Sequence, residues 1–267
     1  MVAKKMAARI ESGDPALRLA VLIDADNAQA AVIERLFAEI ARFGEASVKR
    51  IYGDFTSPLS ASWKQVLQRF AIKPVQQFAY TTGKNATDSA LIIDAMDLLY
   101  TQDFDGFCLV TSDSDFTSLA VRLGEAGLKV FGFGGEKTPE AFRNACDHFF
   151  LTELLRPPPK TPEVSAVAAD PNATEPPKVS PAAAPPPKRP FPKKFIIEAL
   201  AQSSDETGWA NLCSFGSYLK KRQPDFDPRM FGYRKVSDLL RAREDLFIVE
   251  ERGNRGSTQK ALYVRAK

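Results

Sequence analysis

The sequence predicts an α/β domain, with a mostly parallel sheet between two layers of helices, followed by a smaller α+β domain. Apolar runs of strand length alternate with amphipathic helical segments through the first part of the chain. These runs are apolar throughout, which is typical of strands buried on both faces of a parallel sheet. A proline-rich segment then interrupts the pattern before three further helices and two short strands.

Five strand candidates alternate with five helix candidates in the first domain. The helix expected over 28–43 places Val32, Leu36 and Ile40 at helical spacing, which predicts one apolar face. The last helix is expected after Thr138 and Pro139, a typical helix start. The expected strands span residues 19–23, 46–53, 72–80, 107–111 and 128–134, and the other expected helices span 59–70, 88–100 and 116–126.

Composition excludes several classes of protein. The chain has 267 residues with 44% hydrophobic content, enough for one sizeable core and a smaller module. Three cysteines without paired spacing argue against a disulfide framework or a structural zinc site, and a single histidine, His148, excludes a site built on several imidazoles. We assign no role to His148. No apolar run has the length of a membrane span, and the first 14 residues lack the apolar core of a signal peptide, so we expect a cytoplasmic protein.

The chain divides where its composition changes. Residues 156–194 hold 13 of the 19 prolines and read as a linker between a domain over 1–155 and a domain over 195–267. The number of lysines and arginines minus the number of aspartates and glutamates gives a net charge of −4 for the first domain, +4 for the linker and +3 for the last domain. This distribution suggests an acidic site tethered to a module that holds polyanions.

Acidic residues follow two of the predicted strands. Asp24 and Asp26 come after the strand over 19–23, and Asp113 and Asp115 come after the strand over 107–111. Because the carboxyl ends of parallel strands meet at one edge of a sheet, both pairs are expected at that edge. The alternative for any one of these residues is a helix cap or an ordinary loop position.

Asp88 reaches the same region from the start of a helix. At about 100° per residue, most apolar residues of this helix fall within about 80° of Asp88, whereas Asp94 lies about 120° away and Asp97 about 180° away. Asp88 therefore shares the apolar face, Asp97 is expected in solvent, and Asp94 could support the site from outside its ligands. A carboxylate on an apolar face is costly unless it is paired, capped or bound to a metal.

Several carboxylates that converge without a histidine suit a hard divalent cation. Mg²⁺ and Mn²⁺ prefer oxygen ligands and retain water molecules, which lets them bridge to phosphate and activate water for attack on phosphorus. The sequence therefore predicts a Mg²⁺ or Mn²⁺ site that hydrolyses phosphodiester bonds.

Three blocks in order resemble the NYN-domain family of PIN-like metal-dependent ribonucleases: LIDADN at 22–27, GKNATDSALIIDAMDLLY at 83–100, and LVTSDSDFTSLAVRLGEAGLKVFGFG at 109–134. The resemblance implies a Rossmann-like, PIN-type α/β/α fold and RNA as the substrate. It also implies that Asp24, Asp88, Asp113 and Asp115 form a metal-binding cluster and that Asn27 is a polar residue that orients water or phosphate. Asp94 would be the second acid on the helix, and Lys84 would contact phosphate.

A competing class of enzyme also begins with a strand and an Asp-x-Asp sequence. Haloacid-dehalogenase-like phosphatases use the first aspartate as nucleophile and the second as acid, and Asp24 with Asp26 satisfies that spacing. The residues that follow, Asn27 and Ala28, depart from that pattern. This alternative also gives no reason for Asp88 on an apolar face.

The C-terminal domain reads as three helices followed by two strands, LFIVEER and KALYVRA, which is a winged-helix arrangement. The stretch over 224–251 resembles the OST-HTH/LOTUS family, which implies binding of RNA or of a protein partner. Trp209 is expected as a core anchor. The candidate nucleic-acid contacts are the basic residues of a helix end, of the next helix start and of the wing: Lys220, Lys221, Arg222, Arg234, Lys235, Arg252 and Arg255.

The sequence thus predicts a divalent-metal-dependent ribonuclease in which a C-terminal module recruits RNA or a partner. The hypothesis from another class is a non-catalytic RNA-binding or adaptor protein that keeps the acidic cluster for structure. Oligomeric state, substrate sequence and the choice between internal and terminal cleavage do not follow from the sequence.

Overall fold

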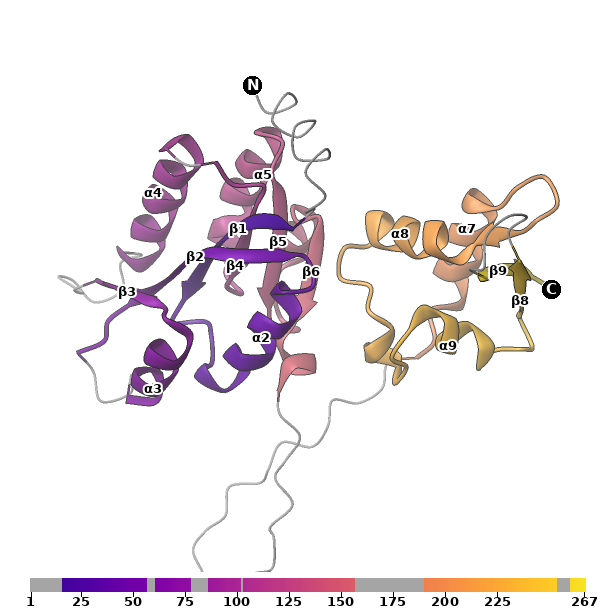
Figure 1. Ribbon diagram of the computed structural model, residues 1–267, viewed down its shortest axis with the longest axis horizontal. Coiled ribbons are helices and arrows are strands. Elements are labelled where there is room, and N and C mark those ends of the chain that lie inside the picture. Colours follow the sequence, from indigo (N-terminus) through magenta and orange to yellow (C-terminus); the bar gives the residue numbers. More distant parts are fainter. Residues whose placement is uncertain (1–15, 57–60, 78–85, 102, 157–189, 254–259) are drawn as a thin grey trace, which may run out of the picture.

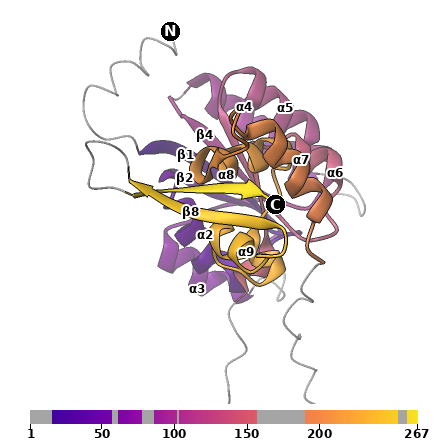
Figure 2. The same ribbon diagram turned by 90° about the vertical axis from the view of Figure 1, so that its right-hand side faces the viewer.

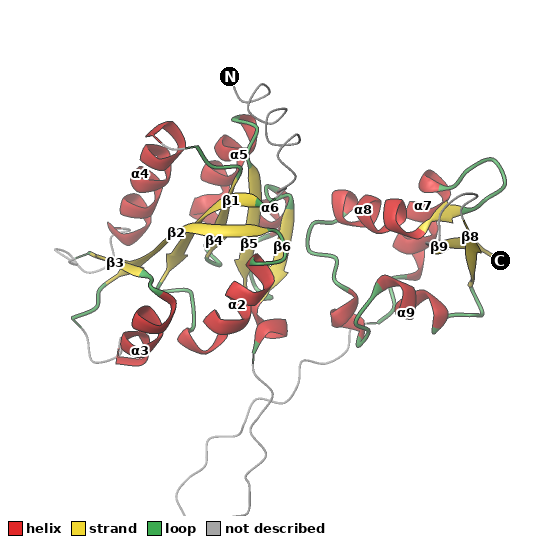
Figure 3. Cartoon of the chain, in the orientation of Figure 1, coloured by secondary structure: helices red, strands yellow, loops and turns green. Residues whose placement is uncertain are grey.

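A computed structural model describes residues 16–56, 61–77, 86–101, 103–156, 190–253 and 260–267. Strands and helices alternate through the first domain (Figures 1 and 3). Its strands are β1 (Leu17–Asp24), β2 (Gly44–Gly53), β3 (Lys73–Gln76), β4 (Gly106–Val110), β5 (Lys129–Gly134) and β6 (His148–Leu151). Its helices are α2 (Ile33–Ile40), α3 (Ala61–Phe70), α4 (Ala86–Thr101), α5 (Thr117–Glu125) and α6 (Glu140–Asn144), with 3₁₀ turns at Ala30–Val32, Ser114–Phe116 and Thr152–Leu155.

The six strands form one parallel sheet in the order β3-β2-β1-β4-β5-β6. The chain moves outward from β1 through β2 to β3 and then returns to the other side of β1 with β4. The carboxyl ends of β1 and β4 therefore flank the point where the strand order reverses. In open α/β sheets, that crevice is where ligands bind.

Helices cover both faces of the sheet. Apolar residues of α4, α5 and α6 pack on one face with the even-numbered positions of β1, such as Ala20 and Leu22. Helices α2 and α3 pack on the other face with the odd-numbered positions Leu19, Val21 and Ile23. The three-layer α/β/α fold predicted from the sequence is confirmed, and the alternation of β1 directs Asp24 toward the face that α4 covers.

The C-terminal domain combines three helices with a small antiparallel sheet (Figure 2). Its helices are α7 (Lys193–Ser203), α8 (Leu212–Arg222) and α9 (Val236–Arg241), with a 3₁₀ turn at Pro228–Phe231, and its strands are β7 (Ala210–Asn211), β8 (Phe247–Gly253) and β9 (Lys260–Ala266). Helix α7 begins within the last two residues assigned to the linker. The expected α+β arrangement with a hairpin is confirmed, and Trp209 is buried as predicted.

The segment between α8 and α9 contacts the first domain beside β6 (Figure 1). The backbone N–H of Phe149 donates to the carbonyl oxygen of Pro224 at 2.9 Å, so part of the open edge of the sheet is covered. Arg143 pairs with Asp225 at 2.9 Å. Met230 also packs against the core of the first domain. Backbone, ionic and apolar contacts therefore hold the two domains together.

Two strands were not predicted. HFFL at 148–151, read from the sequence as a tail beyond the last helix, is β6 at the edge of the parallel sheet. Two residues before α8 form β7, where a longer helix was expected, because Asn211 caps α8 through its side chain. Within the described ranges, no helix combines the length and the apolar character needed to cross a membrane.

Candidate metal centre

Asp24 is the buried base of the acidic site. It ends β1 with a relative exposure of 0%, and three groups donate hydrogen bonds to its carboxylate. These are the backbone N–H of Asp26 at 3.0 Å, Asn27 Nδ2 at 2.7 Å and Thr111 Oγ1 at 2.9 Å. Burial raises the pKa of Asp24, while these donors act in the opposite direction. The carboxylate therefore organises both neighbouring loops.

Above this base, three carboxylates converge from two elements. Oxygens of Asp88, Asp113 and Asp115 all lie within 4.8 Å of one another, which is close enough for all three to share one cation. Asp88 comes from the first turn of α4, and the other two come from the loop after β4. The structure thus brings together three of the four acids predicted from the sequence, while Asp24 is not part of this group.

Local hydrogen bonds fix the loop after β4. Asp113 is the N-cap of the 3₁₀ turn at Ser114–Phe116 and accepts a hydrogen bond from the backbone N–H of Asp115 at 2.9 Å. The backbone N–H of Asp113 in turn donates to Thr111 Oγ1 at 3.1 Å. Asp113 is therefore the cap. The cap bond uses one carboxylate oxygen, Oδ1, and does not use the other.

Burial and neighbouring carboxylates both act on Asp88. Desolvation, together with the negative charges of Asp24, Asp113 and Asp115, raises its pKa to about 6. Without a cation the site therefore holds a carboxyl that resists ionisation. A divalent cation would relieve that repulsion, so the donor set, which contains only oxygen atoms, fits Mg²⁺ or Mn²⁺.

Asp94 lies apart from the cluster. Its carboxylate pairs with Arg50 and accepts a hydrogen bond from the hydroxyl of Tyr52, both on β2. Desolvation and the neighbouring Asp94 raise the pKa of Tyr52 above its usual range. These contacts tie α4 to the sheet six residues beyond Asp88, so Asp94 helps to fix the helix that carries Asp88. Asp97 is exposed, as the helical spacing predicts.

The remaining predicted residues occupy several places. Asn27 is exposed beside the cluster, and Lys84 and Arg255 lie outside the described residues. Lys221 and Arg222 are exposed at the end of α8, whereas Lys220 is half-buried and, with Arg234 and Lys235, lines a pocket between the domains. The guanidinium of Arg252 lies 4.0 Å from the ring centre of Trp209.

From the sequence, Thr111 had no assigned role and Ser112 was suggested only as a cap of the helix that follows. Thr111 joins Asp24 to Asp113, and Ser112 Oγ accepts a hydrogen bond from the backbone N–H of Gly135 at 2.8 Å. Ser112 therefore connects the loops after β4 and β5 and does not cap the following helix. A hydroxyl residue at a strand end next to paired aspartates was the available signal.

Solved structures from three bacteria are similar to parts of this chain. A protein of Nitrosomonas europaea shares 53% identity over 38% of this chain and 92% of its own, with a TM-score of 0.29. A protein of unknown function from Vibrio parahaemolyticus shares 18% identity over 51% of this chain and 93% of its own, with a TM-score of 0.44. A Chromobacterium violaceum fragment shares 26% identity over 31% of this chain and 87% of its own, with a TM-score of 0.24. No curated protein matches the chain.

Two family models match the two domains. The NYN domain model covers residues 18–153, and the OST-HTH/LOTUS domain model covers residues 190–258. Both matches confirm the resemblances seen in the sequence. The NYN domain has a nuclease-like, PIN-like fold, and an OST-HTH domain indicates RNA binding. With its NYN match spanning the sheet, the switch point and the acidic cluster, this chain belongs to the NYN domain family and carries an OST-HTH/LOTUS domain.

Proposed function

We propose that this protein is a divalent-metal-dependent ribonuclease that hydrolyses RNA phosphodiester bonds at the carboxyl ends of β1 and β4. The observation that carries this proposal is the convergence of Asp88, Asp113 and Asp115 within 4.8 Å at the switch point of the sheet. Three carboxylates this close together repel RNA when no cation is bound. A bound cation would reverse that repulsion, which makes the metal part of substrate binding as well as of the chemistry.

Asp88, Asp113 and Asp115 would hold Mg²⁺ or Mn²⁺. When bound, such an ion supplies charge stabilisation at the phosphate and increases the acidity of water. Asn27 is exposed, and its Nδ2 donates to Asp24, so its amide oxygen, which accepts no hydrogen bond from the described residues, would orient a water molecule or a ribose hydroxyl. The role of Asp24 as a further metal ligand stays a prediction. At present its oxygens accept three hydrogen bonds from protein groups.

The test compares two aspartates on the same helix. Labelled single-stranded RNA is incubated with Mn²⁺ and with wild type, Asp88→Asn or Asp97→Asn, and cleavage is followed on a gel. Asp88 belongs to the cluster, whereas Asp97 is exposed on the opposite side of α4. We expect cleavage by wild type and by Asp97→Asn, and a loss of at least about 100-fold in Asp88→Asn, because a charged metal ligand is removed.

Two other results would sink the proposal. Wild type that binds RNA without cutting it would support the non-catalytic RNA-binding or adaptor hypothesis. Hydrolysis of p-nitrophenyl phosphate that depends on Asp24, with RNA untouched, would support the phosphatase hypothesis. The complete burial of Asp24 argues against the second result, since a nucleophile must reach its substrate.

A further inference from the structure

A pocket of about 260 Å³ lies between the two domains, away from the acidic cluster. We call it the junction pocket. The first domain contributes the end of α2 and the start of β6, and the second contributes α8 and the segment over 224–236. Five cationic side chains line it against two carboxylates, and these seven residues are Arg42, Lys220, Arg229, Arg234, Lys235, Glu39 and Asp227. Its excess of positive charge fits an anion.

The two carboxylates are already used. Arg229 pairs with Asp227 at 2.6 Å and with Glu39 at 3.2 Å, and Arg42 pairs with the other oxygen of Glu39 at 2.8 Å. The net positive charge that remains therefore belongs to Lys220, Arg234 and Lys235. Two of these three residues, Arg234 and Lys235, are exposed and open to a ligand.

Lys220 is the most buried of these three cationic groups. It is half-buried, and within the part of the chain that the structure describes, no acceptor takes a hydrogen bond from its ammonium. Desolvation lowers its pKa, the charges of Asp227 and Glu39 act in the opposite direction, and those of Arg42 and Arg229 add to the lowering. A partly buried ammonium without an acceptor is costly, and a phosphate oxygen would supply both the missing hydrogen bond and the opposite charge.

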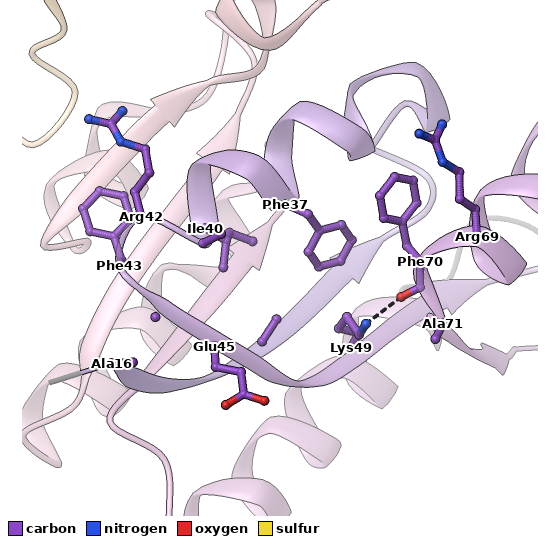
Figure 4. Close-up of a pocket in the computed structure, with 13 residues that line it drawn as sticks. Ala16, Phe37, Ile40, Arg42, Phe43, Glu45, Lys49, Arg69, Phe70 and Ala71 are labelled. Carbon is purple, nitrogen blue, oxygen red and sulfur yellow. Dashed lines mark hydrogen bonds between the residues drawn. The ribbon is translucent and has the colours of Figure 1, made fainter. Parts of the chain in front are cut away.

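Arg42 also lines one end of a second pocket, which we call the aromatic groove. This groove, of about 890 Å³, runs between α2, the start of β2 and the end of α3 (Figure 4). Figure 4 shows Arg42 and Phe43 at one end, Phe37 and Lys49 in the middle, and Phe70 and Arg69 at the other end. Lys49 and Arg69 thus accompany the rings of Phe37 and Phe70 along the groove.

The rings of the groove are partly exposed and held by their neighbours. Phe37 and Phe70 stack with ring centres 5.5 Å apart. Lys49 lies 5.7 Å from the centre of the Phe37 ring and donates to the carbonyl oxygen of Phe70 at 2.6 Å. Arg69 is 5.2 Å from the centre of the Phe70 ring. Glu34 balances Arg69 at 2.8 Å, so the groove offers stacking surfaces more than net charge.

We propose that single-stranded RNA follows a path from the junction pocket, past Arg42, into the aromatic groove. A backbone phosphate lies in the junction pocket, where Lys220 and Lys235 contact it, and adjacent bases stack on the rings of the groove. Positive charge that tracks the backbone beside aromatic rings that accept bases is the arrangement used by proteins that bind single strands without sequence preference. The path rests on the proposed function only in taking RNA as the ligand.

This path would give the OST-HTH domain a geometric role. A phosphate in the junction pocket contacts residues of both domains, so RNA binding would also hold the domains together. The pocket lies beside the start of β6, whereas the acidic cluster lies at the carboxyl ends of β1 and β4. The path therefore binds a part of the strand distant from the bond that is cut.

The experiment measures binding without cleavage. Fluorescence anisotropy of a labelled oligouridylate of about 16 nucleotides, within the site sizes known for single-strand grooves, is recorded in EDTA with the full chain. Two variants test the path: Lys220→Gln with Lys235→Gln, and Phe37→Leu with Phe70→Leu. The matched controls are Lys194→Gln, exposed at the start of α7, and Tyr100→Leu, an exposed ring on α4.

We expect each test variant to bind about tenfold more weakly and each control to stay within about twofold of wild type. The lysine variant should also reduce the slope of log affinity against log salt, by about 0.7 for each phosphate that the protein no longer neutralises. Thermal unfolding checks that Lys220→Gln folds, and its melting temperature should not fall, because the half-buried charge is removed.

Several outcomes would overturn the path. An equal loss in Lys194→Gln would mean that any lysine of the domain contributes to affinity and that RNA follows no defined path. Unchanged RNA affinity in both test variants would leave the groove to another occupant, such as a protein segment. If the lysine variant lost the binding of inorganic phosphate, measured by calorimetry, but kept its RNA affinity, the pocket would be a site for free phosphate. Binding that behaves as expected in a chain that does not cut RNA would overturn only the nuclease proposal.

Discussion

The acidic cluster and the junction pocket treat a polyanion in opposite ways. At the first, Asp88, Asp113 and Asp115 converge and repel RNA unless a cation is bound. At the second, the positive charges of Lys220 and Lys235 line a pocket that we propose binds phosphate without a cation. A nuclease needs both kinds of surface, because a site that holds its substrate only through a metal gains affinity from a separate basic surface. On the proposed function, substitutions at the two sites should change RNA affinity and RNA cleavage independently.

The same contrast appears in two titratable groups. Desolvation and neighbouring carboxylates raise the pKa of Asp88 to about 6. Desolvation, with the nearby Lys220 and Lys129, lowers the pKa of His148 to about 4. Desolvation thus shifts both groups toward their neutral forms, and surrounding negative charge adds to the shift of Asp88 as surrounding positive charge adds to that of His148.

The largest effect is expected at Asp113, which is both a cluster member and a helix cap. Asp113→Asn keeps an oxygen that can cap the 3₁₀ turn but removes a charged ligand, so RNA cleavage should fall at least about 100-fold with little loss of stability. Asp113→Ala should also lose about 1 kcal/mol of unfolding free energy. Cleavage assays and thermal unfolding measure the two effects, and equal cleavage by wild type and Asp113→Asn would contradict the assignment.

The next effect concerns the contact between the domains. Arg229 joins Glu39 to Asp227, and its removal takes away one of the two arginines that pair with the nearly buried Glu39 among the described residues. Because Arg229 is about 30% exposed, we expect Arg229→Ala to weaken docking by only about 1–2 kcal/mol, less than for a fully buried pair. Small-angle scattering should show a larger radius of gyration without a loss of folded domains. Arg241→Ala, on the exposed end of α9, is the control.

The sequence predicted the acidic cluster better than the contacts that support it. Asp88, Asp113 and Asp115 could be predicted because strand ends and helical spacing are local patterns. The bonds from Asp94 to Arg50 and Tyr52 join residues more than 40 positions apart, and no local pattern reports them. The cap at Asp113 was one of the alternatives that the sequence offered, and the hydrogen bond from the backbone N–H of Asp115 shows that Asp113 caps the turn while it also belongs to the cluster.

The junction was beyond local reasoning for the same reason. The strand HFFL follows α6 after only a short turn, and its four residues gave too little pattern to distinguish a strand from a tail. Arg229 and Glu39 lie 190 positions apart, so their pairing depends on how two separately predicted domains dock. The basic residues were predicted as a set, but their division between an exposed face and the junction pocket required the fold.

The charge of Asp88 should make the metal response depend on pH. Its folded pKa, about 6, exceeds the unfolded value near 3.9, so protonation of Asp88 stabilises the metal-free protein fully below about 3.9. That contribution is lost as the pH rises through about 6. Asp88→Asn should therefore melt higher than wild type at pH 7 without metal. Mn²⁺ should raise the melting temperature of wild type at pH 7 but little at pH 5, and should not raise that of the variant.

His148 should show the opposite dependence. Its folded pKa, about 4, lies below the unfolded value near 6.5, so the neutral ring stabilises the fold fully above about 6.5, and this contribution is lost as the pH falls through about 4. His148→Phe keeps the stacking on Phe131, whose ring centre is 5.7 Å away. The variant should gain stability over wild type as the pH falls from 6.5 to 4. Denaturant titrations at several pH values measure this, and a constant difference would contradict it.

The smallest effect is expected on the wing, where a predicted RNA contact is engaged within the domain. Arg252 lies over Trp209 at 4.0 Å and over Tyr263 at 5.1 Å, and it donates to Glu250 at 3.2 Å. Its removal in Arg252→Ala should cost about 0.5–1 kcal/mol of stability and shift the fluorescence of Trp209. If RNA follows the junction pocket, oligouridylate affinity should change less than twofold. A tenfold loss would move RNA recognition to the wing, because Arg252 would then have to leave its stacked position to reach phosphate.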